Sequence, residues 1–206
     1  MPFELWLAFA AASAALLAIP GPTVMLVVSY ALGHGRSTGW ATVPGVTLGD
    51  FTAMTISLAG AGAVLATSAE LFTALKLCGA AYLIYLGIKL WRAEPSPPDA
   101  IIVTAKANSR AMFWNAFVVT ALNPKGIVFF VAFVPQFIDP GRPALQQFVI
   151  LEATFLTLAA ANVAVWAALA GEMRQRFRRP STLKLMNRTG AGFLIGAGVL
   201  TALARR

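Results

Sequence analysis

Two stretches of the chain, "LAIPGPTVMLVV" at 17–28 and "LNPKGIVFFVAF" at 122–133, place proline inside long apolar segments. Proline has no backbone N–H and its ring clashes with the preceding helical turn, so each stretch predicts a broken helix. Gly21, between Pro20 and Pro22, weakens the first helix further because glycine is a poor helix former. Such a break is either a packing kink or irregular backbone that lines a wet cavity. Because one break occurs in each half of the chain, we interpret both as functional.

The composition is that of a membrane protein. The 206 residues are 58% hydrophobic and only 12% charged, whereas soluble domains carry about 25% charged residues. Apolar runs of about 20 residues are long enough to cross a bilayer as helices. The sequence therefore predicts an all-α membrane protein with six transmembrane helices, the first and fourth of them broken. These spans are expected at about 4–32, 40–67, 70–91, 111–136, 145–171 and 187–204.

The basic residues give the expected orientation. With the N-terminus outside, the inner connections hold most of the Lys and Arg residues, whereas the outer connections and the C-terminus hold only Arg142, Arg205 and Arg206. Cytoplasmic loops are enriched in Lys and Arg, so both termini are predicted outside and the linker 93–110 inside. The cluster "RQRFRR" at 174–179 follows the same bias, or alternatively contacts anionic membrane lipid.

Several classes of function are disfavoured. The net charge is +8, but no basic face interleaved with aromatic residues indicates nucleic-acid binding. Cys78 and His34 are the single cysteine and histidine of the chain. They cannot form an internal disulfide or a soft-ligand metal site. We therefore expect no metal and no cofactor, and neither a thiol–disulfide carrier nor a His-cluster protease; the chain is not predicted to be an enzyme.

An internal repeat relates the two halves. Asp50 lies 28 residues after Pro22, and Glu152 lies 28 residues after Pro124. Later in each half, "GAAYLIYLG" at 79–87 matches "GAGFLIGAG" at 190–198. We expect two three-helix repeats, 1–92 and 111–206, joined by the linker 93–110. An odd number of spans in each repeat makes their orientations opposite, and inverted repeats with discontinuous helices are typical of secondary transporters.

The two breaks predict a binding site near the bilayer midplane. The half-helices that begin at Thr23 and Lys125 would point free N–H groups at a cavity, and a helix N-terminus favours a carboxylate. The candidate substrate-binding residues are therefore Pro22, Thr23, Asn123, Pro124 and Lys125. In contrast, the nearby aromatic run in "FFVAF" at 129–133 favours packing over a ligand cage.

Asp50 and Glu152 are the acids well inside the spans, where a lone carboxylate is costly. Each either makes a structural hydrogen bond or carries a coupling proton or a substrate ammonium. Gly45 and Gly49, just before Asp50, predict close approach of another helix. Lys125 stands at a helix start, which disfavours a cation. Its placement predicts an anionic partner, either a substrate carboxylate or one of the two acids.

The chain resembles the LysE/RhtB family of amino-acid exporters. The resemblance rests on "IPGP" at 19–22, "GVTLGD" at 45–50, "LKLCGAAYLIYLGIKLWR" at 75–92 and "NPKGIVFFVAFVPQF" at 123–137, and it covers essentially the whole chain. It implies a multi-pass efflux protein of the bacterial inner membrane, driven by the membrane potential or a proton gradient. Members are described as exporters of lysine, threonine, homoserine, homoserine lactone or related compounds. Asn115 departs from the family, which often has glycine there.

The sequence thus predicts a secondary transporter that exports an amino acid or derivative by proton antiport, with Asp50 and Glu152 as coupling residues. The alternatives are a membrane channel and a structural or assembly protein without coupled transport. The expected partners are the small-molecule substrate, membrane lipid and a second copy of the chain. Gly192 and Gly196 form a GxxxG pattern that serves either such a homodimer or packing within one chain.

Overall fold

The computed structural model describes residues 1–94, 108–139, 141–177 and 180–203, and within them every regular element is helical. The all-α prediction is therefore confirmed. The first half consists of α1 (Phe3–Ala18), α2 (Pro22–His34), a 3-10 turn (Arg36–Thr38), α3 (Gly39–Thr67) and α4 (Ala69–Arg92). The second half consists of α5 (Ser109–Ala121), α6 (Pro124–Val128), a π-helical turn (Phe129–Phe133), a 3-10 turn (Val134–Phe137), α7 (Ala144–Phe177) and α8 (Pro180–Leu203).

Both predicted helix breaks are present. The axes of α1 and α2 meet at 53°, and the axis of α5 meets that of the segment Pro124–Phe137 at 41°. Pro22 and Pro124 are each the first residue of the helix that follows the break. Proline is favourable at that position, because the first N–H of a helix has no partner within the helix. The prolines therefore end one helix and begin the next.

Two of the described helical segments are by themselves long and apolar enough to cross a membrane, Thr73–Arg92 in α4 and Ala144–Ala170 in α7. Counting each bent pair as one broken span raises the number to four. α3 and α8 contain 29 and 24 residues. The described parts of these two helices do not meet the same test.

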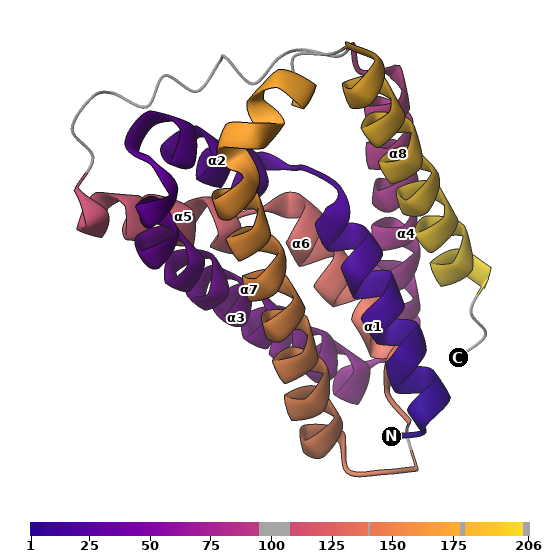
Figure 1. The fold of residues 1–206 in the computed structure, drawn as a ribbon. Helices are drawn as coiled ribbons and strands as arrows, with labels where there is room; N and C mark the ends of the chain where they lie inside the picture. The colour runs from indigo at the N-terminus through magenta and orange to yellow at the C-terminus, as the bar shows by residue number, and fades with distance from the viewer. Residues whose placement is uncertain (95–107, 140, 178–179, 204–206) are drawn as a thin grey trace.

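Helices from opposite halves of the chain pack against each other through glycine. α3 lies against α5, and a Cβ atom at Gly49 would stand 2.8 Å from the carbonyl oxygen of Phe117. A Cβ at Gly45 would overlap the carbonyl oxygen of Phe113. The close approach predicted from these glycines is thus confirmed, and its partner is α5. α4 and α8 run side by side as a second such pair (Figure 1).

The centre of the molecule is an aromatic core. Phe129 and Phe133 stack with ring centroids 5.0 Å apart, and Phe130 meets Phe155 of α7 edge to face at 4.9 Å. All four rings are buried, and they pack with Phe9 and Leu16 of α1. The aromatic run 129–133 therefore serves packing, as the sequence predicts. It holds the second broken helix against α1 and α7.

Two predictions fall on parts of the chain that lie outside the described residues. Most of the predicted linker, residues 95–107, is among them. The cluster at 174–179 is described only as helical backbone up to Phe177, so its predicted place on the inner side and the alternative, contact with anionic lipid, both stay predictions.

Candidate functional site

The two helix breaks meet inside the molecule. Thr23, the second residue of α2, accepts hydrogen bonds from the Thr120 hydroxyl at 3.2 Å and from the Asn123 side-chain amide at 3.3 Å. The Asn123 side-chain oxygen in turn accepts a hydrogen bond from the Lys125 backbone N–H at 3.1 Å, which caps α6. Residues about 100 positions apart thereby join the start of α2 to the second break. Both breaks contribute to a single site.

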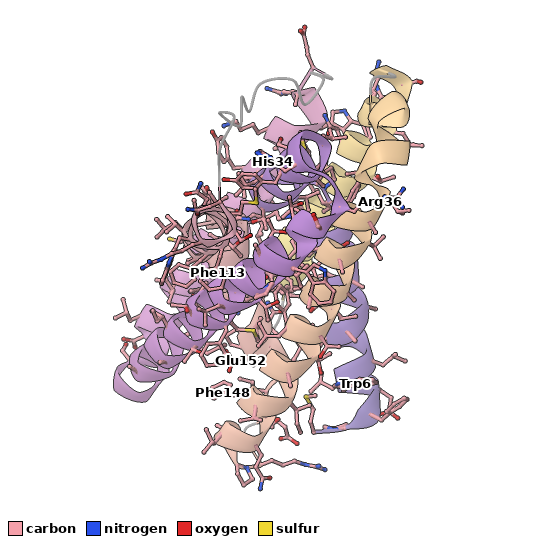
Figure 2. The ribbon with its side chains drawn as sticks, turned by 60° about the vertical axis from the view of Figure 1, so that its left-hand side comes forward. Trp6, His34, Arg36, Phe113, Phe148 and Glu152 are labelled. Atoms are coloured by element: carbon pink, nitrogen blue, oxygen red, sulfur yellow. The ribbon has the colours of Figure 1, made fainter. Side chains whose placement is uncertain are left out.

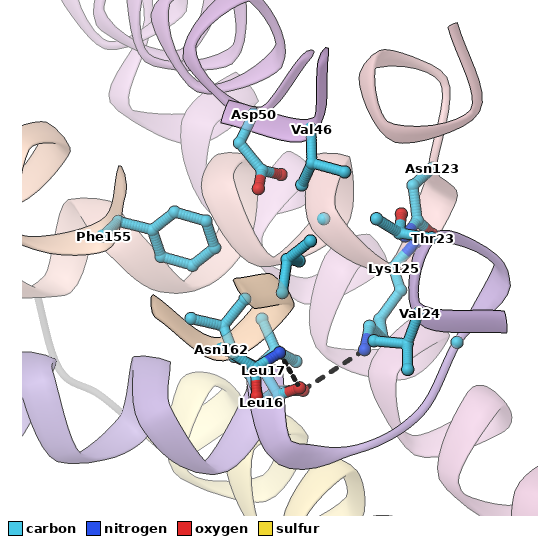
Figure 3. Close-up of a pocket in the computed structure, with 13 residues that line it drawn as sticks. Leu16, Leu17, Thr23, Val24, Val46, Asp50, Asn123, Lys125, Phe155 and Asn162 are labelled. Atoms are coloured by element: carbon cyan, nitrogen blue, oxygen red, sulfur yellow. Dashed lines mark hydrogen bonds between the residues drawn. The ribbon is translucent and has the colours of Figure 1, made fainter. Parts of the chain in front are cut away.

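The Lys125 ammonium lies at the C-terminal end of α1. Its Nζ donates to the carbonyl oxygen of Leu16 at 3.2 Å (Figure 3) and to that of Ile19 at 3.0 Å. The C-terminus of a helix carries partial negative charge and unpaired carbonyls, so a cation is favourable there. Lys125 therefore hydrogen-bonds the end of another helix, and it also interacts electrostatically with Asp50. The predicted binding of a substrate carboxylate stays a prediction. Asn162 of α7 donates to the neighbouring carbonyl of Leu17 at 3.1 Å.

A cavity lies between the two breaks, α3 and α7. The cavity itself has a volume of about 40 Å³, and the wider atom-free space of about 440 Å³ around it includes open solvent. Its walls are formed by Leu16, Leu17, Gly21, Thr23, Val24, Val46, Asp50, Asn123, Lys125, Gly126, Phe155, Asn162 and Val163. Of the seven predicted site residues, Thr23, Asn123, Lys125 and Asp50 line it; Pro22 and Pro124 begin the helices that border it.

Asp50 is the carboxylate of the cavity. Its side chain is only 8% exposed and points into the cavity from α3 (Figure 3). Among the described residues, none donates a hydrogen bond to it, although it interacts electrostatically with Lys125. A buried carboxylate without a hydrogen-bonding partner is unfavourable. The Asp50 carboxylate can therefore accept a hydrogen bond from a ligand in the cavity.

The start of α2 provides a site for an anion. Its N-cap residue is Gly21, and no described side chain caps the helix, so the first N–H groups of α2 have no partner within the helix. The Lys125 ammonium is adjacent, because a Cβ atom at Gly21 would stand 3.4 Å from Nζ. The unpaired N–H groups and the ammonium together favour negative charge at this point.

Glu152 does not line the cavity. Its carboxylate accepts a 2.6 Å hydrogen bond from the Thr55 hydroxyl, and Figure 2 shows it on α7 toward α3. Thr55 lies five residues beyond Asp50 on α3, about 7 Å along the helix axis. Glu152 and Asp50 occupy matching positions in the two halves of the sequence. They thus lie at different depths along the contact between α3 and α7.

Sequence reasoning missed the wall of the cavity that α7 provides. Phe155, Asn162 and Val163 carry no local signal that separates them from other residues of a long apolar helix; only the rotation of α7 brings them to the cavity.

Asn115, the departure from the family pattern, donates a 2.7 Å hydrogen bond to the Tyr30 hydroxyl. It therefore ties α5 to α2.

Comparison with known proteins gives the class of the chain. The sequence profile of the family described as LysE type translocator matches residues 14–205. The chain is 32% identical over 205 residues to the homoserine/homoserine lactone efflux protein of Salmonella typhimurium, with 100% of this chain and 99% of the relative covered. It is 33% identical over 205 residues to a membrane protein of Vibrio cholerae, with both chains covered completely.

A leucine efflux protein of Salmonella choleraesuis is 33% identical over 125 residues, which cover 61% of this chain and 59% of the relative. No solved structure matches the chain. The protein belongs to the LysE family. Its apolar helices and its relatives make it a membrane protein, and the resemblance noted in the sequence is confirmed.

Proposed function

We propose that the protein is a secondary transporter that exports an amino acid or an amino-acid derivative across the bacterial inner membrane in exchange for protons. The observation that carries this proposal is the Asp50 carboxylate, which is buried in a cavity between two helix breaks and receives no hydrogen bond from the described residues. The efflux functions of the relatives support the amino-acid class of the substrate. We further propose that the protein acts as a transporter and not as an enzyme.

The cavity suits a zwitterion. The substrate carboxylate would bind the unpaired N–H groups of α2 beside Thr23 and the Lys125 ammonium, while the substrate ammonium would bind Asp50. Figure 3 shows Asp50 above the cavity, with Thr23, Asn123 and Lys125 together at its right. The cavity must offer a charge of opposite sign to each charged group of the ligand, because burying a charge without a partner is costly.

Asp50 would also take part in proton coupling. It would release its proton to bind the substrate ammonium and be reprotonated after release. Glu152 lies one layer further along α3 and α7, beside Thr55. That layer is the outer one in the proposed topology, so Glu152 would receive protons from outside and pass them toward Asp50.

We propose a multi-pass topology of six spans, formed by the two bent pairs, α3, α4, α7 and α8. The start of α1 and the end of α8 lie toward the lower side in Figure 1, whereas the ends of α4 and α7 lie toward the upper side. This arrangement supports termini on one side of the membrane and the linker on the other. The bias of Lys and Arg assigns the termini to the outside.

Reciprocal packing supports the inverted repeat of 1–92 and 111–206. In the aligned stretches 79–87 and 190–198, Gly87 corresponds to Gly198. A Cβ at Gly87 would meet the Ala191 carbonyl at 2.9 Å, and a Cβ at Gly198 would meet the Ala80 carbonyl at 2.7 Å. Ala80 and Ala191 are themselves corresponding residues. When each residue is replaced by its counterpart in the other half, the contact of Gly87 with Ala191 becomes the contact of Gly198 with Ala80. A pseudo-two-fold axis between α4 and α8 requires this.

The experiment is efflux of labelled amino acids from cells that contain or lack the protein. We expect faster loss of at least one amino acid when the protein is present, and loss of that difference when the proton gradient is collapsed. A channel would give conductance without saturable, proton-linked flux. An assembly protein would give no flux and would tolerate Asp50→Asn. Absence of flux for the whole panel would contradict the proposal.

A further inference from the structure

The cavity has an apolar wall, and we infer that this wall selects an amino acid with an uncharged aliphatic side chain. The inference rests on the proposed function and names the substrate class of the same site. The wall consists of Val46 of α3 and Phe155 and Val163 of α7. All three are almost completely buried, at 1%, 1% and 2% exposure, so an apolar ligand group against them leaves water.

Three polar residues of the cavity lie away from Phe155, whereas Val46 lies beside Asp50 (Figure 3). Thr23, Asn123 and Lys125 lie together on one side, Phe155 lies on the opposite side, and Asp50 lies between them (Figure 3). A zwitterion with its carboxylate at α2 and Lys125, and its ammonium at Asp50, therefore directs its side chain toward Phe155. Val163 and Val46 border the same space.

The charges of the cavity are matched to the backbone of an amino acid and leave none for its side chain. Asp50 and Lys125 are the ionisable residues in the described lining. A lysine or glutamate substrate would bring a third charge to the wall of Val46, Phe155 and Val163. An unpaired buried charge is strongly unfavourable, so both charged classes are excluded.

A side-chain hydroxyl would be less strongly rejected. Asn162 also borders the cavity, but its amide nitrogen already donates to the Leu17 carbonyl at 3.1 Å. Its side-chain oxygen is the polar group left for a hydroxyl at this wall. Apolar pockets discriminate against an added hydroxyl by up to about 100-fold. We therefore expect leucine and valine to be preferred over homoserine and threonine by about tenfold or more.

The test measures efflux of labelled leucine, homoserine, lysine and glutamate from vesicles that contain the purified full-length protein. We expect leucine to be transported fastest, homoserine about tenfold more slowly, and lysine and glutamate not above protein-free vesicles. Transport of lysine, glutamate or homoserine at a rate equal to that of leucine overturns the inference and leaves the proposed function standing. Transport of none of the four, nor of the wider amino-acid panel, contradicts the proposed function itself.

Val163→Thr tests the wall directly, because threonine has nearly the same shape as valine. We expect it to lower the leucine-to-homoserine ratio by about tenfold. Val165→Thr is the matched control: it lies on the same helix but is 55% exposed and outside the cavity, so its ratio should equal that of the unchanged protein. Val46→Thr tests the wall at an independent second position. Each variant is first checked for folding, which a single symmetric peak in size-exclusion chromatography indicates. An unchanged ratio in both Val163→Thr and Val46→Thr shows that the side chain binds elsewhere and overturns the inference.

Discussion

Asp50 and Lys125 are the charged residues in the described lining of the cavity, and they are held in different ways. Lys125 donates two hydrogen bonds to the end of α1, whereas Asp50 accepts none from the described residues. Lys125 thus has a structural role in addition to the proposed binding of a carboxylate. Asp50 interacts electrostatically with Lys125, but no described residue donates a hydrogen bond that would fix it in place, which favours a role in binding a ligand or a proton.

The substitution Asp50→Asn is expected to abolish gradient-driven export while the protein still folds and inserts. Asparagine keeps the shape of the side chain and its hydrogen-bonding capacity, but it cannot take up a proton. It also removes the cost of a carboxylate within the membrane, so stability should hold or increase. Flux into or out of vesicles under an imposed pH gradient, together with thermal stability, measures both effects.

Glu152→Gln serves as the comparison for Asp50→Asn. Because Glu152 lies outside the cavity and is paired with Thr55, we expect slower but measurable export. Normal transport by Asp50→Asn would mean that the coupling residue lies elsewhere. Failure of Asp50→Asn to fold would assign that carboxylate a structural role.

The substitution Lys125→Met is expected to destabilise the protein by about 1–3 kcal/mol, because the Ile19 carbonyl loses the donor provided by Lys125 at the end of α1. Thermal unfolding in detergent measures this. Lys89→Met is the control, since Lys89 is exposed near the end of α4, and its unfolding temperature should be unchanged. Equal unfolding temperatures for the two variants would show that the contacts of Lys125 with α1 contribute nothing to stability.

At the scale of elements, glycine decides how closely the helices approach. α3 carries two kinds of glycine: Gly45 and Gly49 face the backbone of α5, whereas Gly60 and Gly62 have open space where a Cβ would be. The first kind permits contact between helices. The second kind costs conformational entropy on folding and permits no such contact. This difference gives a test within one helix.

Gly49→Ala is expected to destabilise the protein by about 1–3 kcal/mol, because the new Cβ would stand 2.8 Å from both the Phe117 carbonyl oxygen and Thr120 Cβ. Gly60→Ala should instead stabilise α3 by roughly 0.5–1 kcal/mol, the usual difference between the two residues in a helix. Unfolding of both variants in the same detergent compares them. Equal effects would mean that α3 and α5 do not approach as closely as described.

At the scale of the whole molecule, the proposed topology assigns the chain ends and the linker to opposite sides of the membrane. Reporter fusions at Ala105 and after Arg206 are therefore expected to report opposite sides, with Arg206 outside. A fusion after His34 should agree with Ala105, because both follow an inward end of a span. Equal reports from Ala105 and Arg206 would overturn both the topology and the inverted repeat.

The homodimer is a further proposal at this scale. Nothing lies within 4 Å of a Cβ built at Gly192 or Gly196. The GxxxG face of α8 therefore faces outward, and its alternative role in packing within one chain does not hold in the described structure. Such a face lets a helix of a second copy approach closely.

Gly196→Leu is expected to convert a dimer into a monomer, because the larger side chain keeps the two helices apart. Light scattering with size-exclusion chromatography measures the mass. Gly62→Leu is the control, since Gly62 has equally open surroundings on α3 and should leave the dimer intact. A monomeric unchanged protein, or a dimeric Gly196→Leu variant, would contradict the proposal.

The sequence by itself determined the helical membrane class, both helix breaks and the glycines through which α3 meets α5. These features follow from local properties: apolar length, the missing N–H of proline and the missing side chain of glycine. The sequence also indicated Asp50, because an acid within an apolar segment is conspicuous, and Thr23, Asn123 and Lys125, because they lie at the two proline breaks.

Only the tertiary structure decided which residues share the cavity. Phe155, Asn162 and Val163 face it, and Glu152 does not, although the repeat pairs Glu152 with Asp50. Lys125 binds carbonyls of Leu16 and Ile19, more than 100 residues earlier in the chain. The rotation of α7 and the position of α1 depend on packing against helices that are distant in sequence, and no local pattern of residues specifies that rotation.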